Sequence, residues 1–243
     1  MKAFVAAHDS KHSKPLSPRE FSQAVVVALA PVADASRRGA MRAYMKHQFD
    51  YLGIKTPVRR VAVASLIREQ KDLSCADLLR CARVLWSMHE REYQYVAIDL
   101  LARHAGKFTP AHLPELFALV QKKSWWDTVD ALAGVIGQVM KRACSDDPAA
   151  QRVMDKALAS PNLWVRRVAI LHQLGWRRQT DSKRLFLYAT TCAHETDFFI
   201  RKAIGWALRD YARHAPDEVR RFLRANRSKL SPLTIREAAK HIS

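Results

Sequence analysis

Two tryptophans and two carboxylates lie within eight residues of a strongly basic chain, in the stretch KSWWDTVD at residues 123–130. On a helix, Trp125 and Trp126 would point about 100° apart, whereas Trp126 and Asp130 would share a face as an i, i+4 pair. Asp127 falls near the expected helix start, where a carboxylate complements the dipole and can accept a backbone N–H. We interpret Asp127 as structural and Asp130 as the candidate reactive carboxylate. A buried aromatic pair with a capping acid is the structural alternative.

Two later segments carry side chains that could complete such a site. NLWVRRVAI supplies Trp164, Arg166 and Arg167, and IGWALRDY supplies Trp206. If the three segments are neighbours in a stack of helices, they would line one groove with two tryptophans, a carboxylate and an arginine. Tryptophan faces carry negative quadrupoles, so such a groove would favour a positively charged group. The structural alternatives are that Trp164 belongs to the core, that Trp206 only packs, and that Arg166 is plain surface.

The elements that would position these residues recur along the chain. Segments with polar or basic starts and apolar bodies repeat at intervals of roughly 34 to 38 residues, enough for one helix pair per unit, and they align on Ala62, Ala97, Ala131, Ala169 and Ala203. Stacked inner helices of this kind would present their N-terminal ends along one surface. The repeat therefore predicts an α-solenoid.

Local signals are helical throughout. Strand signals are scarce, with seven glycines and no Asn-Gly or Asp-Gly turn. A Ser, Thr or Asp precedes Pro at six places, a pattern that predicts an N-cap followed by Pro at the first helical position, namely Ser17, Thr56, Thr109, Asp147, Ser160 and Ser231. We predict an all-α, single-domain fold over residues 19–243, preceded by a flexible extension at residues 1–18 that does not resemble a secretory signal.

Composition limits the partners. The 243 residues are 49% hydrophobic, enough for a sizeable core, and 41 Lys and Arg against 23 Asp and Glu give a net charge of +18. This balance favours a polyanion, with nucleic acid first and an anionic membrane surface second. No apolar run is long enough to span a bilayer. Arginines and helix N-termini facing one concave surface would bind phosphates by charge and dipole together.

The sequence gives little indication of a metal site or of a disulfide. The four cysteines are far apart and form no C-x-x-C pair, which is typical of buried thiols in a reducing compartment. The only i, i+4 histidine pair, His8 and His12, lies in the polar extension. We therefore expect no metal and no cofactor.

Several longer segments carry a more specific resemblance. In order from about residue 20 to the C-terminus, these segments are MRAYMKHQFDYLGIKTPVRR, KSWWDTVD, NLWVRRVAILHQL, DFFIRKAIGWALRDYA and LSPLTIREAAKHI. They resemble the AlkD-type DNA alkylation repair glycosylases, which are built of HEAT-like repeats. The chain departs from the family in a longer amino end and in carrying Arg166 beside Arg167, where the family usually has one arginine. The resemblance implies an α-solenoid of HEAT-like repeats with a basic, concave DNA-binding groove.

The resemblance also implies roles for individual residues. The family's aromatic contacts to the sugar and backbone of the lesion fall on Trp126 and Trp206, and its catalytic carboxylate falls on Asp130. Its phosphate-binding arginine falls on Arg167, and a tyrosine near the lesion falls on Tyr44. Arg166, the second arginine that departs from the family pattern, is our own additional candidate for a DNA contact. The implied substrate is duplex DNA with cationic alkylated purines, such as 7-alkylguanine and 3-alkyladenine, removed without base flipping.

The chemistry explains an acid in a basic groove. Cleavage of an N-glycosidic bond passes through an oxocarbenium-like sugar, which a nearby carboxylate such as Asp130 can stabilise while it positions the attacking water. A cationic base leaves as a neutral molecule and needs no general acid. A second catalytic carboxylate is therefore not required.

Three hypotheses remain. The first is this base-excision glycosylase, acting as a monomer in the cytoplasm and associated with the nucleoid when bound to DNA. The second is a non-catalytic HEAT-like module that binds damaged or branched DNA through the same groove, because some members of the family lack these residues. The third is a protein-binding scaffold, which would need an acidic partner.

Overall fold

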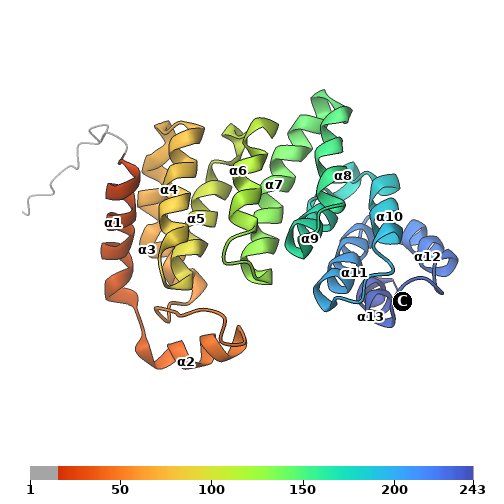
Figure 1. Ribbon diagram of the computed structural model, residues 1–243, viewed down its shortest axis with the longest axis horizontal. Coiled ribbons are helices and arrows are strands. Elements are labelled where there is room, and N and C mark those ends of the chain that lie inside the picture. The colour runs from red at the N-terminus through yellow and green to blue at the C-terminus, as the bar shows by residue number, and fades with distance from the viewer. Residues whose placement is uncertain (1–15, 243) are drawn as a thin grey trace, which may run out of the picture.

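The computed structural model describes residues 16–242. Within that range the chain forms thirteen α-helices joined by short 3₁₀ turns, and no strand. Apart from α2, the helices form one elongated stack that runs from α1 at one end to α11, α12 and α13 at the other (Figure 1), so the predicted all-α fold is confirmed. Residues 1–15 of the predicted extension lie outside the described part, whereas α1 already begins at Pro18.

The five recurring segments are all helices, and they form one layer. Each contacts the next along the chain, and α13 (Pro232–Ala238) continues the series beyond the last of them. The five are α3 (Thr56–Glu69), α5 (Arg91–Arg103), α7 (Trp126–Asp146), α9 (Leu163–Leu171) and α11 (Phe198–Ala212). We call this layer the inner helices.

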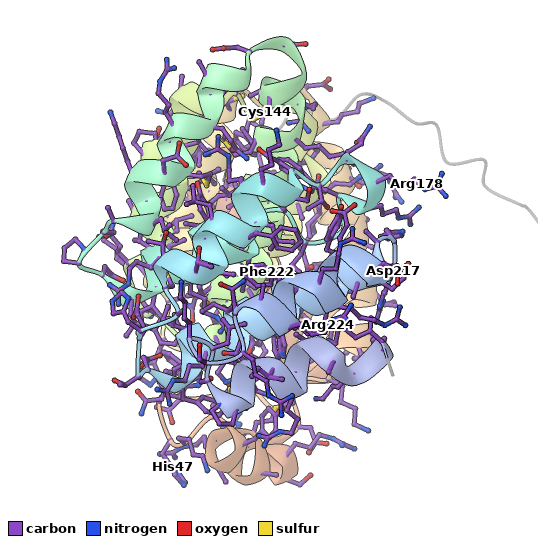
Figure 2. All side chains as sticks on the ribbon, turned by 90° about the vertical axis from the view of Figure 1, so that its right-hand side faces the viewer. His47, Cys144, Arg178, Asp217, Phe222 and Arg224 are labelled. Atoms are coloured by element: carbon purple, nitrogen blue, oxygen red, sulfur yellow. The ribbon has the colours of Figure 1, made fainter. Side chains whose placement is uncertain are left out.

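The second layer packs on the first. Each of its helices contacts an adjacent inner helix, and the layer comprises α1 (Pro18–Leu29), α4 (Cys75–Ser87), α6 (Leu113–Val120), α8 (Arg152–Leu158), α10 (Ser182–Thr191) and α12 (Pro216–Ala225). The contact between layers is apolar, because buried hydrophobic residues of both layers form one core cluster. Neighbours within the second layer also pack: Figure 2 views the C-terminal end, where Phe222 of α12 faces α10 and its ring stacks on that of Phe186 with centroids 4.5 Å apart.

The Pro-based helix starts are partly confirmed. Ser17 and Ser231 cap α1 and α13 with Pro at the first position, while Thr109 and Asp147 precede short 3₁₀ turns. The prediction was wrong at Ser160 because Asn162, two residues on, accepts bonds from the N–H groups of α9 and becomes its cap. It was also wrong at Thr56, which is already the first residue of α3.

The alanines on which the repeat aligns are fully buried in three of the five helices. Ala97, Ala169 and Ala203 are fully buried, whereas Ala62 is half-buried and Ala131 is exposed. Close stacking does not depend on these alanines alone. A Cβ added at Gly137 of α7 would lie 2.0 Å from the carbonyl oxygen of His172, just after α9, so only glycine permits this approach.

Helix α2 (Ala35–Tyr44) differs from the others. It lies below and apart from the stack at the N-terminal end (Figure 1), and none of its residues is buried. Its last residue, Tyr44, is 70% exposed. None of the helices within residues 16–242 combines the length and apolarity needed to cross a membrane.

Candidate active site

Asp130 and Arg167 form a two-pronged ion pair between α7 and α9. Nε and Nη2 of the arginine each donate to one carboxylate oxygen of Asp130 at 2.7 Å. The remaining Nη1 donates to the carbonyl oxygen of Phe199 in the first turn of α11. The side chain of Arg167 is 1% exposed and that of Asp130 is 19% exposed. One arginine therefore links three inner helices and fixes the orientation of the carboxylate.

The environment of Asp130 acts on its proton affinity in two directions. Burial favours the neutral acid and raises the pKa of Asp130, and this effect outweighs the opposing hydrogen bonds and charge of Arg167. The carboxylate is therefore poorly hydrated, oriented and still reachable from solvent along one edge. Those are the properties of a group that can stabilise a developing cation.

Trp206 contacts the arginine that holds this carboxylate, and Trp126 lies one turn before Asp130 on α7. The Cζ of Arg167 lies 5.4 Å from the ring centroid of Trp206, which is half-buried on α11. Trp126 is the first residue of α7. The ring of Tyr44 meets Trp126 edge to face with centroids 6.0 Å apart. In the structure, Arg167 therefore contacts both Asp130 and Trp206. Trp126 is connected to this group because it lies on α7 with Asp130, and Tyr44 of α2 because its ring contacts that of Trp126.

Trp125 and Trp164 have a different place. Trp125 is the N-cap residue of α7, with extended backbone at φ −158°, and is not in the helix. The predicted 100° separation from Trp126 therefore does not apply. Its ring lies 5.8 Å from Trp164 and 5.2 Å from Phe199, so the two tryptophans form a half-buried aromatic cluster.

Asp127 is structural, but not as a cap. Its carboxylate accepts bonds from Nε and Nη2 of Arg91 at 2.9 and 2.7 Å, and a third from the hydroxyl of Tyr95 at 2.7 Å. The predicted bond to a backbone N–H was wrong because the side chain faces α5. Burial raises the pKa of Tyr95 well above its ordinary value, so the phenol remains a hydrogen-bond donor.

Arg166 is turned away from this group. It donates to both oxygens of Glu195 at 2.8 Å and to the carbonyl oxygens of Ser160 and Pro161. The bonds to Glu195 raise the pKa of Arg166. A phosphate at Arg166 would have to compete with these partners, and one at Arg167 would have to displace a bond to Asp130 or Phe199. The DNA contacts of both arginines stay predictions.

The Asp130 pair belongs to a series. A cation and a carboxylate bridge three consecutive contacts between inner helices, at Arg59–Asp99, Arg91–Asp127 and Arg167–Asp130, and a further pair, Lys202–Glu237, joins α11 to α13. If the role of Asp130 were purely structural, its ion pair would be one more member of this series. Asp130 is more exposed than Asp127 and Glu237. It differs from Asp99 because its partner, Arg167, also contacts a tryptophan.

Two features were missed from the sequence. A cavity of about 550 Å³ lies between α2, α3, α5 and α7, with Tyr44 and Trp126 in its wall, and Asp130 does not line it. Glu237 on α13 binds the indole N–H of Trp206; the only signal was a lone acid in a basic C-terminal segment. Within residues 16–242, no three His, Cys, Asp or Glu side chains are placed to hold a metal ion.

No curated protein matches the chain. A solved structure described as AlkD2 from Streptococcus mutans is 20% identical, with a TM-score of 0.58, and the match covers 73% of this chain and 86% of that one. This likeness shows the fold alone and agrees with the predicted HEAT-like repeats.

A nearer relative carries more weight. A structure described as a predicted DNA alkylation repair enzyme from Enterococcus faecalis is 32% identical, with a TM-score of 0.81, and the match covers 87% of this chain and 97% of that one. The family described as DNA alkylation repair enzyme matches residues 25–242. Because that match spans nearly the whole repeat stack and includes Asp130, Arg167 and both site tryptophans, the chain belongs to the DNA alkylation repair enzyme family.

Proposed function

We propose that this protein is a DNA glycosylase of base excision repair. It hydrolyses the N-glycosidic bond of cationic alkylated purines, 7-alkylguanine and 3-alkyladenine, in duplex DNA. The observation that carries the proposal is Asp130, a largely buried carboxylate held by Arg167 beside Trp206, with one edge open to solvent.

Asp130 acts on the sugar. Both of its oxygens are held by Arg167, so the carboxylate cannot rotate away as positive charge develops on the deoxyribose. The edge open to solvent can accept a proton from the attacking water. Prepositioned charge of this kind stabilises the transition state more than the ground state.

No second acid is needed. An alkylated base that carries a positive charge leaves as a neutral molecule once the glycosidic electrons move onto it. This supports the proposal because the neighbouring acids are committed: Asp127 accepts from Arg91 and Tyr95, and Glu237 accepts from four donors.

The two tryptophans contribute differently. Lys202 and Arg209 lie 5.6 and 5.8 Å from the ring centroid of Trp206, in addition to Arg167. The described contacts place no protein cation over Trp126, whose ring forms a T-shaped pair with that of Tyr44. We therefore assign recognition of the cationic lesion to Trp126, worth about 0.5 to 2 kcal/mol, and contact with the sugar and backbone to Trp206.

The base stays in the duplex on this proposal. Glycosylases generally extrude their target base into a pocket. The cavity beside Trp126 is not lined by Asp130, which supports attack on a base read through its sugar and backbone. Bulky adducts would then be accepted, since no tight pocket has to enclose them.

One observation favours the alternative, a non-catalytic module that binds damaged or branched DNA. Asp130 is one of three carboxylates that bridge inner helices, and Glu237 joins α11 to α13 in the same way, so the ion pair of Asp130 could serve stability alone. A binder would tolerate loss of this negative charge near phosphates, whereas an enzyme would not.

The test is single-turnover release of 7-methylguanine from duplex DNA at matched salt. We expect Asp130→Asn to abolish release and to retain DNA binding. Asp127→Asn is the matched control, because it breaks an equivalent ion pair one turn away on α7. Breaking a fully buried pair costs about 3 to 5 kcal/mol, so this control measures the effect of lost stability without loss of the reactive group.

The outcomes separate the hypotheses. Release by the wild type and by Asp127→Asn, but not by Asp130→Asn, supports the glycosylase. Unchanged release by Asp130→Asn would remove this carboxylate from the mechanism. Tight binding with no release by any of the three proteins would identify the non-catalytic module.

A further inference from the structure

Helix α13 buries one carboxylate in a cluster of cations. Oε1 of Glu237 accepts a bond from Nζ of Lys202 at 2.9 Å. Oε2 accepts from Nζ of Lys240 at 2.9 Å, from Nη1 of Arg209 at 3.1 Å and from the indole N–H of Trp206 at 3.2 Å. The Glu237 side chain is only 5% exposed. A single carboxylate therefore holds three cations and one of the two site tryptophans.

The backbone is shaped for this arrangement. Lys202, Trp206 and Arg209 are spaced i, i+4 and i+7 along α11 and share the face that meets α13. Between them, a Cβ added at Gly205 would lie 2.5 Å from the Cβ of Glu237 and 3.0 Å from the carbonyl oxygen of Thr234. Only glycine lets α13 come close enough for Glu237 to reach the indole.

The cluster keeps its charge at working pH. Burial alone would raise the pKa of Glu237, but the hydrogen bonds and charges of Lys240 and Lys202 outweigh it and lower the pKa to about 2. The ionised carboxylate therefore holds Lys202 and Arg209 beside the ring of Trp206. Without it, both cations would be free to turn toward phosphate.

We propose that Glu237 is a positioning residue for this site: it fixes the indole of Trp206 through its N–H and restrains Lys202 and Arg209 from binding DNA phosphates outside the productive register. The effect on excision rests on the proposed glycosylase function. The effects on Trp206 and on DNA binding do not. Loss of the carboxylate should therefore change binding and excision in opposite directions.

Three variants separate these effects. Glu237→Gln keeps a hydrogen-bond acceptor for the indole and removes the charge, whereas Glu237→Ala removes both. Glu218→Gln is the control, because it makes the same change of net charge on neighbouring α12, where Glu218 accepts only from the hydroxyl of Tyr211. Any gain in DNA affinity due to net charge alone will appear in this control.

The first measurement is the indole N–H resonance of Trp206, assigned by its loss in Trp206→Phe. In Glu237→Ala we expect it to move toward the position of a solvated indole, and in Glu237→Gln to stay nearer that of the wild type. An unchanged resonance in folded Glu237→Ala would overturn the orientation role. If Glu237→Ala does not fold, the binding and excision measurements on Glu237→Gln decide.

The second measurement compares binding with turnover. Glu237→Gln should bind undamaged duplex more tightly than Glu218→Gln does, and its salt dependence should steepen by about two phosphate contacts. At saturating protein, release of 7-methylguanine should slow in both Glu237 variants, roughly tenfold or more in Glu237→Ala. DNA affinity no greater than that of the control would overturn the restraint of Lys202 and Arg209. If the wild type releases no base, the proposed function fails while the resonance and binding measurements still test Glu237.

Discussion

Asp130 and Asp127 lie one turn apart on α7, and both are paired with an arginine, yet their surroundings differ. Asp127 accepts three bonds from Arg91 and Tyr95 and is 6% exposed. Asp130 accepts bonds from Arg167 alone and is 19% exposed. Asp127 therefore has little capacity left for another partner, whereas Asp130 keeps an edge that water or a sugar can approach. We place the chemistry at Asp130 for this reason.

The raised pKa of Asp130 predicts how excision depends on pH. Stabilisation of the sugar cation needs the ionised form, so the single-turnover rate should fall as pH drops through a value above the ordinary 3.8 of an aspartate. The Asp127→Asn variant should show the same fall in rate at low pH. A rate that stays level down to pH 3.8 in a folded protein would contradict the assignment.

The free energy of unfolding should also depend on the ionisation of Asp130, but the contribution of this group should fall as pH rises, whereas the excision rate should increase. Because the folded state holds the proton of Asp130 more tightly than the unfolded state does, this group makes folding less favourable as pH rises from 3.8 through the raised pKa. The stability of the wild type relative to Asp130→Asn should therefore decrease as pH rises across that window. Denaturant unfolding of both proteins at several pH values measures the difference, and a relative increase would show that the Arg167 contact outweighs burial.

At the scale of elements, α7 carries the site and must stay close to α9. Trp126, Asp127 and Asp130 all lie in its first two turns. Farther along, Gly137 lets the chain at His172 approach without a side chain between them. The Asp130–Arg167 pair spans the same two helices, so their separation sets the geometry of the carboxylate.

Two glycines of α7 make a matched test of this spacing. Gly137→Ala should destabilise the protein by about 1 to 3 kcal/mol, because its Cβ would overlap the carbonyl oxygen of His172. Gly134→Ala meets no atom within 4 Å and should stabilise the helix by about 0.5 to 1 kcal/mol. Thermal unfolding compares the two, and base release should slow only in Gly137→Ala. Equal stabilities would show that the α7 to α9 contact tolerates a wider spacing.

At the scale of the whole molecule, we expect the excess of positive charge to drive association with DNA. Most acids between inner helices are already paired with a cation, yet a net charge of +18 remains to act on a polyanion. Phosphate contacts make binding depend on salt, since each one releases condensed counterions. This property is shared by the enzyme and by the non-catalytic module.

Salt dependence is therefore the test at this scale. We expect the affinity for undamaged duplex to fall by about 10³ to 10⁵ between 50 and 200 mM salt if six to ten phosphates are contacted. Fluorescence anisotropy with a labelled duplex measures the slope, and analytical ultracentrifugation tests the predicted monomer. Binding that hardly changes with salt would favour the protein-scaffold hypothesis, in which DNA is not the partner.

Much of this protein follows from sequence alone. The helix period and the repeat of 34 to 38 residues predicted the five inner helices, and Pro-containing caps predicted the starts of α1 and α13. The i, i+4 spacing placed Trp126 and Asp130 within the same turns of α7. These features are local: they depend on residues within a turn or two of each other, and the backbone geometry of a helix determines them. A structural role for Asp127 was also predicted, but the predicted partner, a backbone N–H at the helix start, was wrong, because the carboxylate accepts from Arg91 and Tyr95 of α5.

Tertiary structure decided the partners. Asp130 meets an arginine 37 residues away, and Glu237 reaches Trp206 from another helix. Trp125 lies outside α7, and Arg166 faces Glu195 although its neighbour Arg167 faces the site. These outcomes depend on how far each helix is rotated and on how closely it stacks against the next. Glycines such as Gly205 permit the close stacking, and a periodic sequence pattern does not encode it. The period located the helices, and their packing selected which charges meet.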